Sequence, residues 1–159
     1  LYILTIVHSV GYVIYYHFGP GESESTAYLA QLRDYESKKT LRDQAEQANI
    51  SEDVLKTAMS DTSALAAGKN VFVARCASCH GQNGEGIIGP NLTDKYQLHG
   101  STRMDIFTVV QRGVPGTAML AWGEQLGPEE VRAVSAYAAS LRGGNVSGKE
   151  PQGAPVEGF

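Results

Sequence analysis

The hydrophobic and polar positions divide this chain into four stretches with different patterns. Residues 1–18 are largely apolar and contain no Asp, Glu, Lys or Arg. Residues 19–60 are mainly polar, with apolar residues at helical spacing, and residues 61–143 hold helical apolar stripes separated by glycine-rich loops. Residues 144–159 are rich in glycine and proline. No strand pattern surrounds the helical stripes, so the chain is predicted to be all-α.

The first stretch, residues 1–18, is predicted to be a transmembrane helix. Eighteen helical residues rise about 27 Å, just short of a hydrocarbon core of roughly 30 Å. Tyr12, Tyr15 and Tyr16 gather at one end, as in an aromatic interfacial belt, and Gly19-Pro20-Gly21 then breaks the helix. Because the first residue is Leu1 rather than Met, we expect further residues upstream, which would lengthen the span.

Two other interpretations of this stretch fit less well. A cleaved signal peptide needs a positively charged start and a small-residue cleavage site, and neither is visible. A buried core helix carries its apolar residues on one stripe, whereas here they lie on all sides. His8 is therefore interpreted as a structural histidine within the span.

Residues 19–60 are predicted to form a helical spacer. After the candidate cap Ser25, apolar residues recur at helical spacing, namely Tyr28, Leu29, Leu32 and Tyr35. Ser51, followed by two acidic residues, predicts a second helix start. The spacer is either a solvated tether or a docking arm on a partner subunit, and the sequence favours neither.

The third stretch, residues 61–143, is predicted to be a helical domain, followed by an extended tail over residues 144–159. The predicted helix starts are Asp61 or Ser63, Ser101, and Pro128 in a first turn. Gly68 and Phe72 lie four apart on one face of the first of these helices. Such a pair lets another helix approach closely while an aromatic ring fills the core beside it.

The five residues from Cys76 to His80 spell C-x-x-C-H, the attachment site of a c-type haem. Two thiols spaced three apart on a helical turn both reach the vinyl groups on one edge of a porphyrin and form thioethers. The histidine that follows then lies under the iron as the proximal axial ligand. We therefore predict one covalently attached haem c, bound through Cys76 and Cys79, with His80 on the iron.

Other uses of these cysteines are weaker. A zinc site needs four ligands, and beyond the motif the chain offers only His8, His17 and His99, two of which lie in the apolar stretch. A thioredoxin-like redox pair needs a βαβ setting, which the pattern does not predict. The motif also uses both of the chain's 2 cysteines, so none is left for a disulfide.

The residues after the motif supply candidate surroundings for the haem. A glycine-rich loop allows the backbone to pass close to the haem edge, and the Pro90 carbonyl is expected to accept a hydrogen bond from His80 Nδ1–H. Met119, in an irregular loop between two predicted helices, is the preferred sixth ligand. Met104 and His99 remain alternatives, and Met59 precedes the domain.

Together these residues resemble a class I cytochrome c domain over residues 68–141. The shared features are Gly68-x-x-x-Phe72, Cys76–His80, Gly89-Pro90-Asn91-Leu92, Met119 before Trp122, and Val134-x-x-Tyr137. More narrowly, the chain resembles the membrane-anchored cytochrome c subunit of cbb3-type haem–copper oxidases, called subunit III or the P subunit. That narrower resemblance is carried by Gly89-Pro90-Asn91-Leu92-Thr93-Asp94 followed by His99-Gly100, Gly113-Val114-Pro115, and Tyr-Tyr-His before Gly-Pro-Gly.

Two departures from that family stand out. Its members usually carry two C-x-x-C-H motifs in tandem, and this chain has one. The family also usually places proline after the ligand methionine, where this chain has Leu120. The first departure puts the partner complex in doubt, whereas the second concerns the rigidity of the loop.

The resemblance implies a mono-haem cytochrome c that relays single electrons within a respiratory complex, towards a haem–copper centre. Its implied partners are the other subunits of that complex, with a quinol-oxidising complex or a cytochrome c as electron donor. Such haems are attached on the outer side of the bacterial inner membrane, which implies a single pass with the haem domain in the periplasm. The flank agrees, since Glu22 and Glu24 follow the span and no Lys or Arg occurs before Arg33.

Several alternatives stay open at this point. One alternative is a haem subunit of another membrane assembly, such as an alternative complex III or a photosynthetic reaction centre. A second is a haem sensor or peroxidase with an open distal site, and a third is a structural anchor with a vestigial haem. Tyr96, Arg103 and Trp122 are candidate partners for the haem propionates, against ordinary packing or surface roles. The net charge of −4 suggests no nucleic-acid partner. We expect an electron-transfer subunit rather than a stand-alone enzyme.

Overall fold

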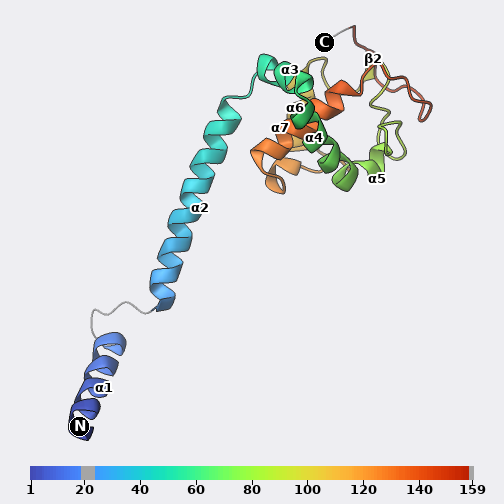
Figure 1. The fold of residues 1–159 in the computed structure, drawn as a ribbon. Coiled ribbons are helices and arrows are strands. Elements are labelled where there is room, and N and C mark those ends of the chain that lie inside the picture. The colour runs from blue at the N-terminus through green and yellow to red at the C-terminus, as the bar shows by residue number, and fades with distance from the viewer. Residues whose placement is uncertain (19–23, 158–159) are drawn as a thin grey trace. The chain divides into compact units, whose positions relative to one another are not determined.

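The structure, a computed structural model, describes residues 1–18 and 24–157. Within these ranges the elements are α1 (Tyr2–His17), α2 (Glu24–Ala48), α3 (Glu52–Ser60), α4 (Thr62–Arg75), α5 (Ala77–His80), β1 (Tyr96–Gln97), α6 (Arg103–Arg112), the 3-10 helix η1 (Trp122–Glu124), α7 (Pro128–Ser140) and β2 (Ala154–Pro155). The chain divides into two compact units, Leu1–Gln44 and Ala45–Phe159 (Figure 1). The predicted helical fold is confirmed, with one small sheet of two strands added to it.

The first unit contains α1, which covers most of the predicted transmembrane stretch. Its side chains are exposed, and Tyr12 stacks on Tyr16 with ring centroids 4.6 Å apart at the C-terminal end. Among residues 1–18 and 24–157, no helix has both the length and the apolar character needed to cross a membrane. The predicted break at Gly19-Pro20-Gly21 lies outside the described residues.

The other helix of this unit, α2, is long and polar. The predicted cap Ser25 lies inside the helix, because α2 already begins at Glu24. An exposed ion pair joins Lys38 to Asp34 one turn earlier, with Nζ and Oδ2 2.8 Å apart. The apolar residues Tyr28, Leu29 and Tyr35 are exposed along it.

The second unit starts before the predicted domain boundary at residue 61. Helix α3, which the sequence placed in the spacer, belongs to this unit because Leu55 and Ala58 are buried in its core. Ser51 caps α3 as predicted, since its hydroxyl accepts a hydrogen bond from Val54 N–H at 3.3 Å. Apolar spacing alone did not reveal that this helix packs onto the domain.

The core of the second unit lies where α4 crosses α7. Gly68 and Phe72 of α4 are both buried, and a Cβ built on Gly68 would overlap the Ala133 carbonyl oxygen of α7. The Phe72 ring packs edge-on against Tyr137 with centroids 5.3 Å apart. The predicted small–large pair at a helix crossing is confirmed.

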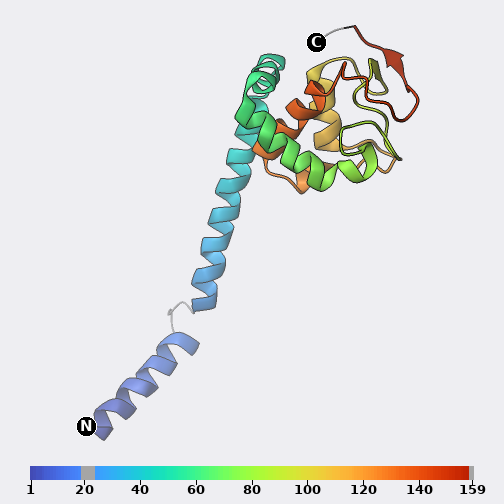
Figure 2. The ribbon, with the colours of Figure 1, turned by 45° about the vertical axis from the view of Figure 1, so that its right-hand side comes forward.

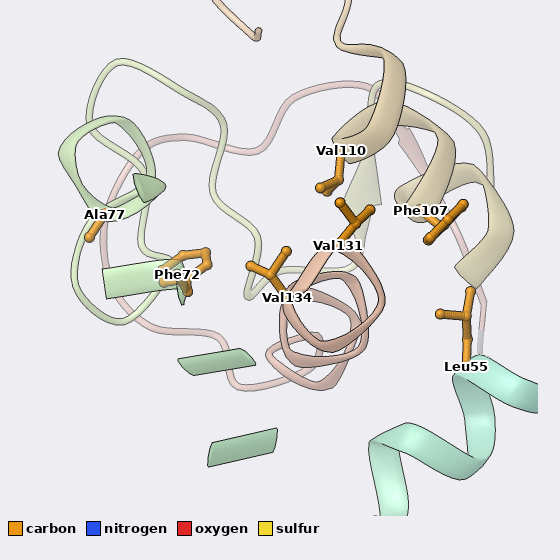
Figure 3. Close-up of a cluster of buried hydrophobic side chains, with 7 residues drawn as sticks. All are labelled: Leu55, Phe72, Ala77, Phe107, Val110, Val131 and Val134. Atoms are coloured by element: carbon orange, nitrogen blue, oxygen red, sulfur yellow. The ribbon is translucent and has the colours of Figure 1, made fainter. Parts of the chain in front are cut away.

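Helix α7 is the central element of this core. It is largely buried and contacts α3, α4 and α6. Figure 3 shows Val131 and Val134 of α7 between Phe72 on one side and the α6 residues Phe107 and Val110 on the other. This arrangement joins the helix before the C-x-x-C-H motif to the helix before the methionine loop.

Helix starts in the second unit follow local hydrogen bonding, and one of them is shifted from the prediction. Asp61 caps α4 as predicted, and Pro128 occupies the first position of α7. The predicted cap Ser101 is wrong by one residue, because Thr102 caps α6 and forms a capping box with Asp105. The Ser101 N–H instead donates to Asp105 Oδ2 at 2.7 Å, so the same carboxylate serves both residues.

A cross-helix carboxylate explains why α3 belongs with the domain. Glu52 Oε1 accepts a hydrogen bond from Arg103 Nη1 at 2.8 Å, and Glu52 Oε2 accepts from Met104 N–H at 3.1 Å. Burial by itself raises the pKa of Glu52, but these hydrogen bonds and the Arg103 charge outweigh it and lower the pKa. Glu52, which lies in α3, thus fixes the first turn of α6.

We expect Glu52→Gln to lower the free energy of unfolding by about 1–3 kcal/mol at pH 7, because the buried Arg103 loses its ionic partner. Since the pKa of Glu52 is lowered in the fold, its contribution is present above the ordinary carboxyl pKa and is lost as the pH falls through the lowered pKa. Urea titrations at pH 7 and below about pH 4 should therefore show the wild type and the variant converging in acid. As a control, Glu129→Gln removes an exposed ion pair with Arg132 and should change the free energy of unfolding by less than about 0.5 kcal/mol. Equal effects of the two variants would contradict the stabilising role of Glu52.

The C-terminal tail is extended, but it packs on the domain. Ala154 and Pro155 form β2, which pairs antiparallel with β1 in the register Tyr96 to Pro155 and Gln97 to Ala154. Figures 1 and 2 show this segment beside the loops that follow α5. The glycine- and proline-rich composition predicted an extended tail, but it did not predict these contacts with the domain.

Candidate haem-binding site

The C-x-x-C-H motif forms one short helical turn at the end of α4. Cys76 N–H donates to Phe72 O at 2.8 Å, and the N–H groups of Cys79 and His80 donate to Cys76 O at 3.0 and 2.9 Å. Ala77 between them is buried in the core, while both cysteines are half-buried. The turn therefore anchors its backbone in the core and brings the two thiols and the imidazole together on one turn.

The loop after the motif folds back onto this turn. Three successive N–H groups, of Ile87, Ile88 and Gly89, donate to the Cys79 carbonyl oxygen at 3.0, 3.0 and 2.9 Å. Gly89 lies so close to His80 that a Cβ at this glycine would approach the imidazole Cε1 to 2.7 Å. A glycine is required here because the loop backbone packs directly on the imidazole ring.

The predicted orienting contact of His80 is confirmed. His80 Nδ1 lies 3.0 Å from the Pro90 carbonyl oxygen. Because a carbonyl oxygen only accepts, Nδ1 carries the proton and Nε2 keeps its lone pair for a metal. This is the tautomer that an axial imidazole ligand needs.

Burial is the main influence on the pKa values of Cys76 and His80. Burial, and secondly the neighbouring Cys79, raises the pKa of the Cys76 thiol to about 11. Burial also lowers the pKa of His80, the nearby Lys149 charge adds to this, and the Pro90 hydrogen bond opposes it. The raised pKa of Cys76 leaves little thiolate, so Cys76 does not fit the role of a reactive nucleophile.

These features fit a haem c better than a bare metal ion. The two thiols and an imidazole with a free Nε2 are the donor set that covalent haem attachment uses. Within residues 1–18 and 24–157, no group of three or more His, Cys, Asp or Glu side chains is arranged to hold a metal ion.

Met119 lies in the loop between α6 and η1 and packs against the same core as Cys76. Its backbone is fixed on both sides: Val114 N–H donates to Met119 O at 3.0 Å, and Met119 N–H donates to Thr117 Oγ1 at 3.1 Å. Gly113, at φ 66, approaches Met119 O so closely that a Cβ would lie 2.6 Å from it. The loop is therefore held in one conformation despite lacking regular structure.

The alternatives to Met119 have other surroundings. Met59 Sδ accepts a hydrogen bond from Arg103 Nε at 3.2 Å on the α3 side of the domain. Met104 lies in the first turn of α6, partly buried against the core, and His99 is exposed. The structure thus gives Met59 a role away from the motif and places Met104 in the packing role expected for it.

The three candidate propionate partners fall in different places. The guanidinium of Arg103 is buried and contacts Glu52 and Met59 of α3. Trp122 opens η1 and packs against the core, and Tyr96 lies half-buried in β1 beneath Lys95, whose Nζ is 5.9 Å from the ring centroid. Their role toward a propionate stays a prediction.

Two residues that hold the Pro90 loop were not predicted from the sequence. Thr93 and Asn91 are only 1% and 8% exposed, and Asn91 Oδ1 accepts hydrogen bonds from both Thr93 N–H and Thr93 Oγ1–H. An asparagine two residues before a threonine is a signal for such a local turn and was available in the sequence. No pattern in the sequence indicated a role for Lys149 at this loop.

Comparison with known proteins shows what this domain is similar to. Residues 63–137 match the family described as "Cytochrome C oxidase, cbb3-type, subunit III". This stretch of the chain is therefore similar to the cytochrome c subunit of cbb3-type oxidases. The matched range runs from the first turn of α4 to the Tyr137 contact on α7 and includes the C-x-x-C-H turn, the Pro90 loop and Met119.

Curated relatives bear the names of cbb3-type oxidase subunits. The chain is 39% identical over 87 residues to the "Cbb3-type cytochrome c oxidase subunit FixP" of Azorhizobium caulinodans, covering 53% of this chain and 29% of that protein. It is 29% identical over 157 residues to the "Cbb3-type cytochrome c oxidase subunit CcoP" of Azospirillum sp., covering 82% of this chain and 53% of that protein. The chain therefore spans about half, or less, of the length of these relatives.

One solved structure is also similar. It is cytochrome cL from the methylotrophic bacterium Methylophaga aminisulfidivorans, which is 26% identical, with a TM-score of 0.45, covering 52% of this chain and 55% of that one.

Proposed function

We propose that this chain is a mono-haem cytochrome c that relays single electrons within a membrane respiratory complex, towards a haem–copper oxidase. The observation that carries the proposal is the C-x-x-C-H turn, with His80 Nδ1 held by Pro90 O, inside a stretch similar to the cytochrome c subunit of cbb3-type oxidases. A haem c bound there supplies a one-electron couple.

The chain's own residues fix such a group and limit its chemistry. Cys76 and Cys79 would hold it through thioethers, and His80 and Met119 would bind its iron. A thioether ligand favours ferrous iron and so raises the reduction potential. Iron bound by both side chains would leave no open position for a substrate, which suits electron transfer rather than a sensor or a peroxidase.

The membrane anchor is part of the proposal. Residues 1–18 contain no Asp, Glu, Lys or Arg, and α1 exposes its apolar residues along its length. Such a surface is unfavourable in water and suits lipid or a partner subunit. We propose a single pass in the bacterial inner membrane, with the haem domain in the periplasm and the oxidase subunits as partners. The alternative is that the chain is a haem subunit of another membrane complex, such as an alternative complex III or a photosynthetic reaction centre.

A direct test expresses the full chain in a bacterium that matures c-type cytochromes. We expect haem that stays bound after denaturation, at one haem per chain, and protein that stays in the membrane after an alkaline wash. Mass spectrometry of the subunits that co-purify in mild detergent distinguishes an oxidase from another complex. Absence of covalent haem would overturn the function, and release by the alkaline wash would overturn the anchor alone.

A further inference from the structure

The C-terminal segment of residues 145–156, which we call the strap, forms hydrogen bonds along its length with the loop that carries Pro90. Its backbone donates three hydrogen bonds to that loop: Asn145 N–H to Thr93 O at 3.0 Å, Lys149 N–H to Glu85 O at 2.9 Å, and Val156 N–H to Lys95 O at 2.8 Å. The β1–β2 pair completes the contact. The strap therefore supplies this irregular loop with backbone hydrogen bonds that the loop does not make with itself.

The side chain of Lys149, in the strap, contacts the loop that packs on the haem-binding turn. Its Nζ donates to the Ile88 carbonyl oxygen at 2.6 Å, and the Ile88 N–H donates in turn to Cys79 O at 3.0 Å. Ile88 stands two residues before Pro90, whose carbonyl holds His80. A short chain of hydrogen bonds thus runs from the lysine to the C-x-x-C-H turn.

The other end of the Pro90 loop is tied to the strap by buried polar groups. Asn91 Nδ2 donates to Val146 O at 3.1 Å, and Val146 N–H donates to Thr93 Oγ1 at 2.9 Å. Because Asn91 and Thr93 are buried, they have no water to replace a lost partner. The loop is thus held by the strap on both sides of Pro90.

The strap and the loop approach each other at glycine positions. A Cβ on Gly148 would overlap the Glu85 carbonyl oxygen, and a Cβ on Gly86 would come within 2.9 Å of Lys149 Cβ. These contacts leave no room for a side chain between the two segments. A single methyl group at Gly148 therefore displaces the strap while leaving the lysine charge in place.

We propose that the strap positions the Pro90 carbonyl, and through it His80, with Lys149 as its central positioning residue. The inference rests on the proposed function, in which His80 is an axial ligand of the haem iron. Lys149 also holds a positive charge on Ile88 O, two residues before Pro90, and such a charge would favour the reduced state of an iron bound by His80, because that state is less positive by one unit. The strap thus sets both the ligand geometry and part of the reduction potential.

The test compares Lys149→Met, Lys149→Arg and Gly148→Ala in the full chain. The first readout is amide hydrogen exchange of residues 85–98, and the second is the reduction potential together with the NMR signals of the axial histidine. Lys56→Met removes an exposed lysine from α3, and Gly127→Ala adds a methyl group at φ −67 with no neighbour closer than 3.8 Å. These two variants are matched controls for charge and for steric bulk.

We expect Lys149→Met to speed exchange in the Pro90 loop about tenfold or more, as for the loss of a hydrogen bond to a charged group, and to lower the reduction potential. Lys149→Arg should restore the potential towards the wild-type value. Gly148→Ala should speed exchange with the charge retained, and both controls should behave as the wild type.

The outcomes separate the strap from the proposed function. Wild-type protein without covalent haem would overturn the proposed function, and hydrogen exchange would still report whether the strap orders the loop. Unchanged exchange in haem-loaded Lys149→Met and Gly148→Ala would overturn the strap. Faster exchange with unchanged potential and histidine signals would show a merely structural contact and would overturn the positioning role.

Discussion

Replacing Gly68 with valine should destabilise the domain by about 3 kcal/mol or more, which is a large fraction of the stability of a domain of this size. A Cβ at Gly68 meets the Ala133 carbonyl carbon at 2.7 Å and Tyr137 Cβ at 2.8 Å, besides the Ala133 carbonyl oxygen. Two of these atoms belong to the backbone of α7 and have no rotamer that avoids the overlap. The helices must separate, and the contact between the Phe72 and Tyr137 rings is lost with them.

The alanine variant separates packing from helix propensity. Alanine favours an α-helix over glycine by about 1 kcal/mol, so on propensity alone Gly68→Ala should stabilise α4. We expect it to destabilise the domain instead, because overlap with backbone atoms outweighs that gain. The measurement is denaturant unfolding of the full chain, followed by circular dichroism.

The control for this experiment is Ala67→Val on the exposed side of the same helix. It tests the cost of a β-branched residue in α4 without a neighbouring helix, which should stay below about 1 kcal/mol. If Gly68→Ala and Ala67→Val had similar effects, the close crossing of α4 and α7 would be contradicted.

The features predicted correctly from the sequence were those determined by nearby residues. The Asp61 cap depends on residues two and three positions away, and the helical spacing of Gly68 and Phe72 marks one face of one helix. The contact between His80 and Pro90 spans ten residues, and it was predicted because the motif assigns a role to the histidine. In each case a single segment contained the whole signal.

The features missed join segments that the sequence does not relate. Glu52 and Arg103 are 51 residues apart, and an acidic residue in a first helical turn has a sufficient local role there. An arginine is usually exposed, so burial of Arg103 against α3 was not predictable from its type. The strap lacks periodicity because its contacts are mainly between backbone groups, which every sequence possesses.

Replacing Met119 with alanine should leave the haem covalently bound but change its iron. In the proposed function the sulfur of Met119 is the sixth ligand, so its loss opens one axial position. We expect the reduced variant to bind carbon monoxide, which the wild type should not do readily, and the reduction potential to fall by on the order of 0.1 V. Optical spectra of the reduced protein with and without carbon monoxide, and a redox titration, provide the measurements.

Met104→Ala is the matched control, because Met104 has the same side chain and also packs against the core. That variant should lose stability by about 2–3 kcal/mol through a cavity, with the spectrum and the potential unchanged. If the spectrum and the potential changed in Met104→Ala and not in Met119→Ala, Met104 would be the sixth ligand of the iron. Carbon monoxide binding to the reduced wild type would favour a sensor with an open iron site. Because Gly113 and Val114 hold the Met119 backbone, the loop should keep its conformation in Met119→Ala, and the change at the iron then reports the missing sulfur alone.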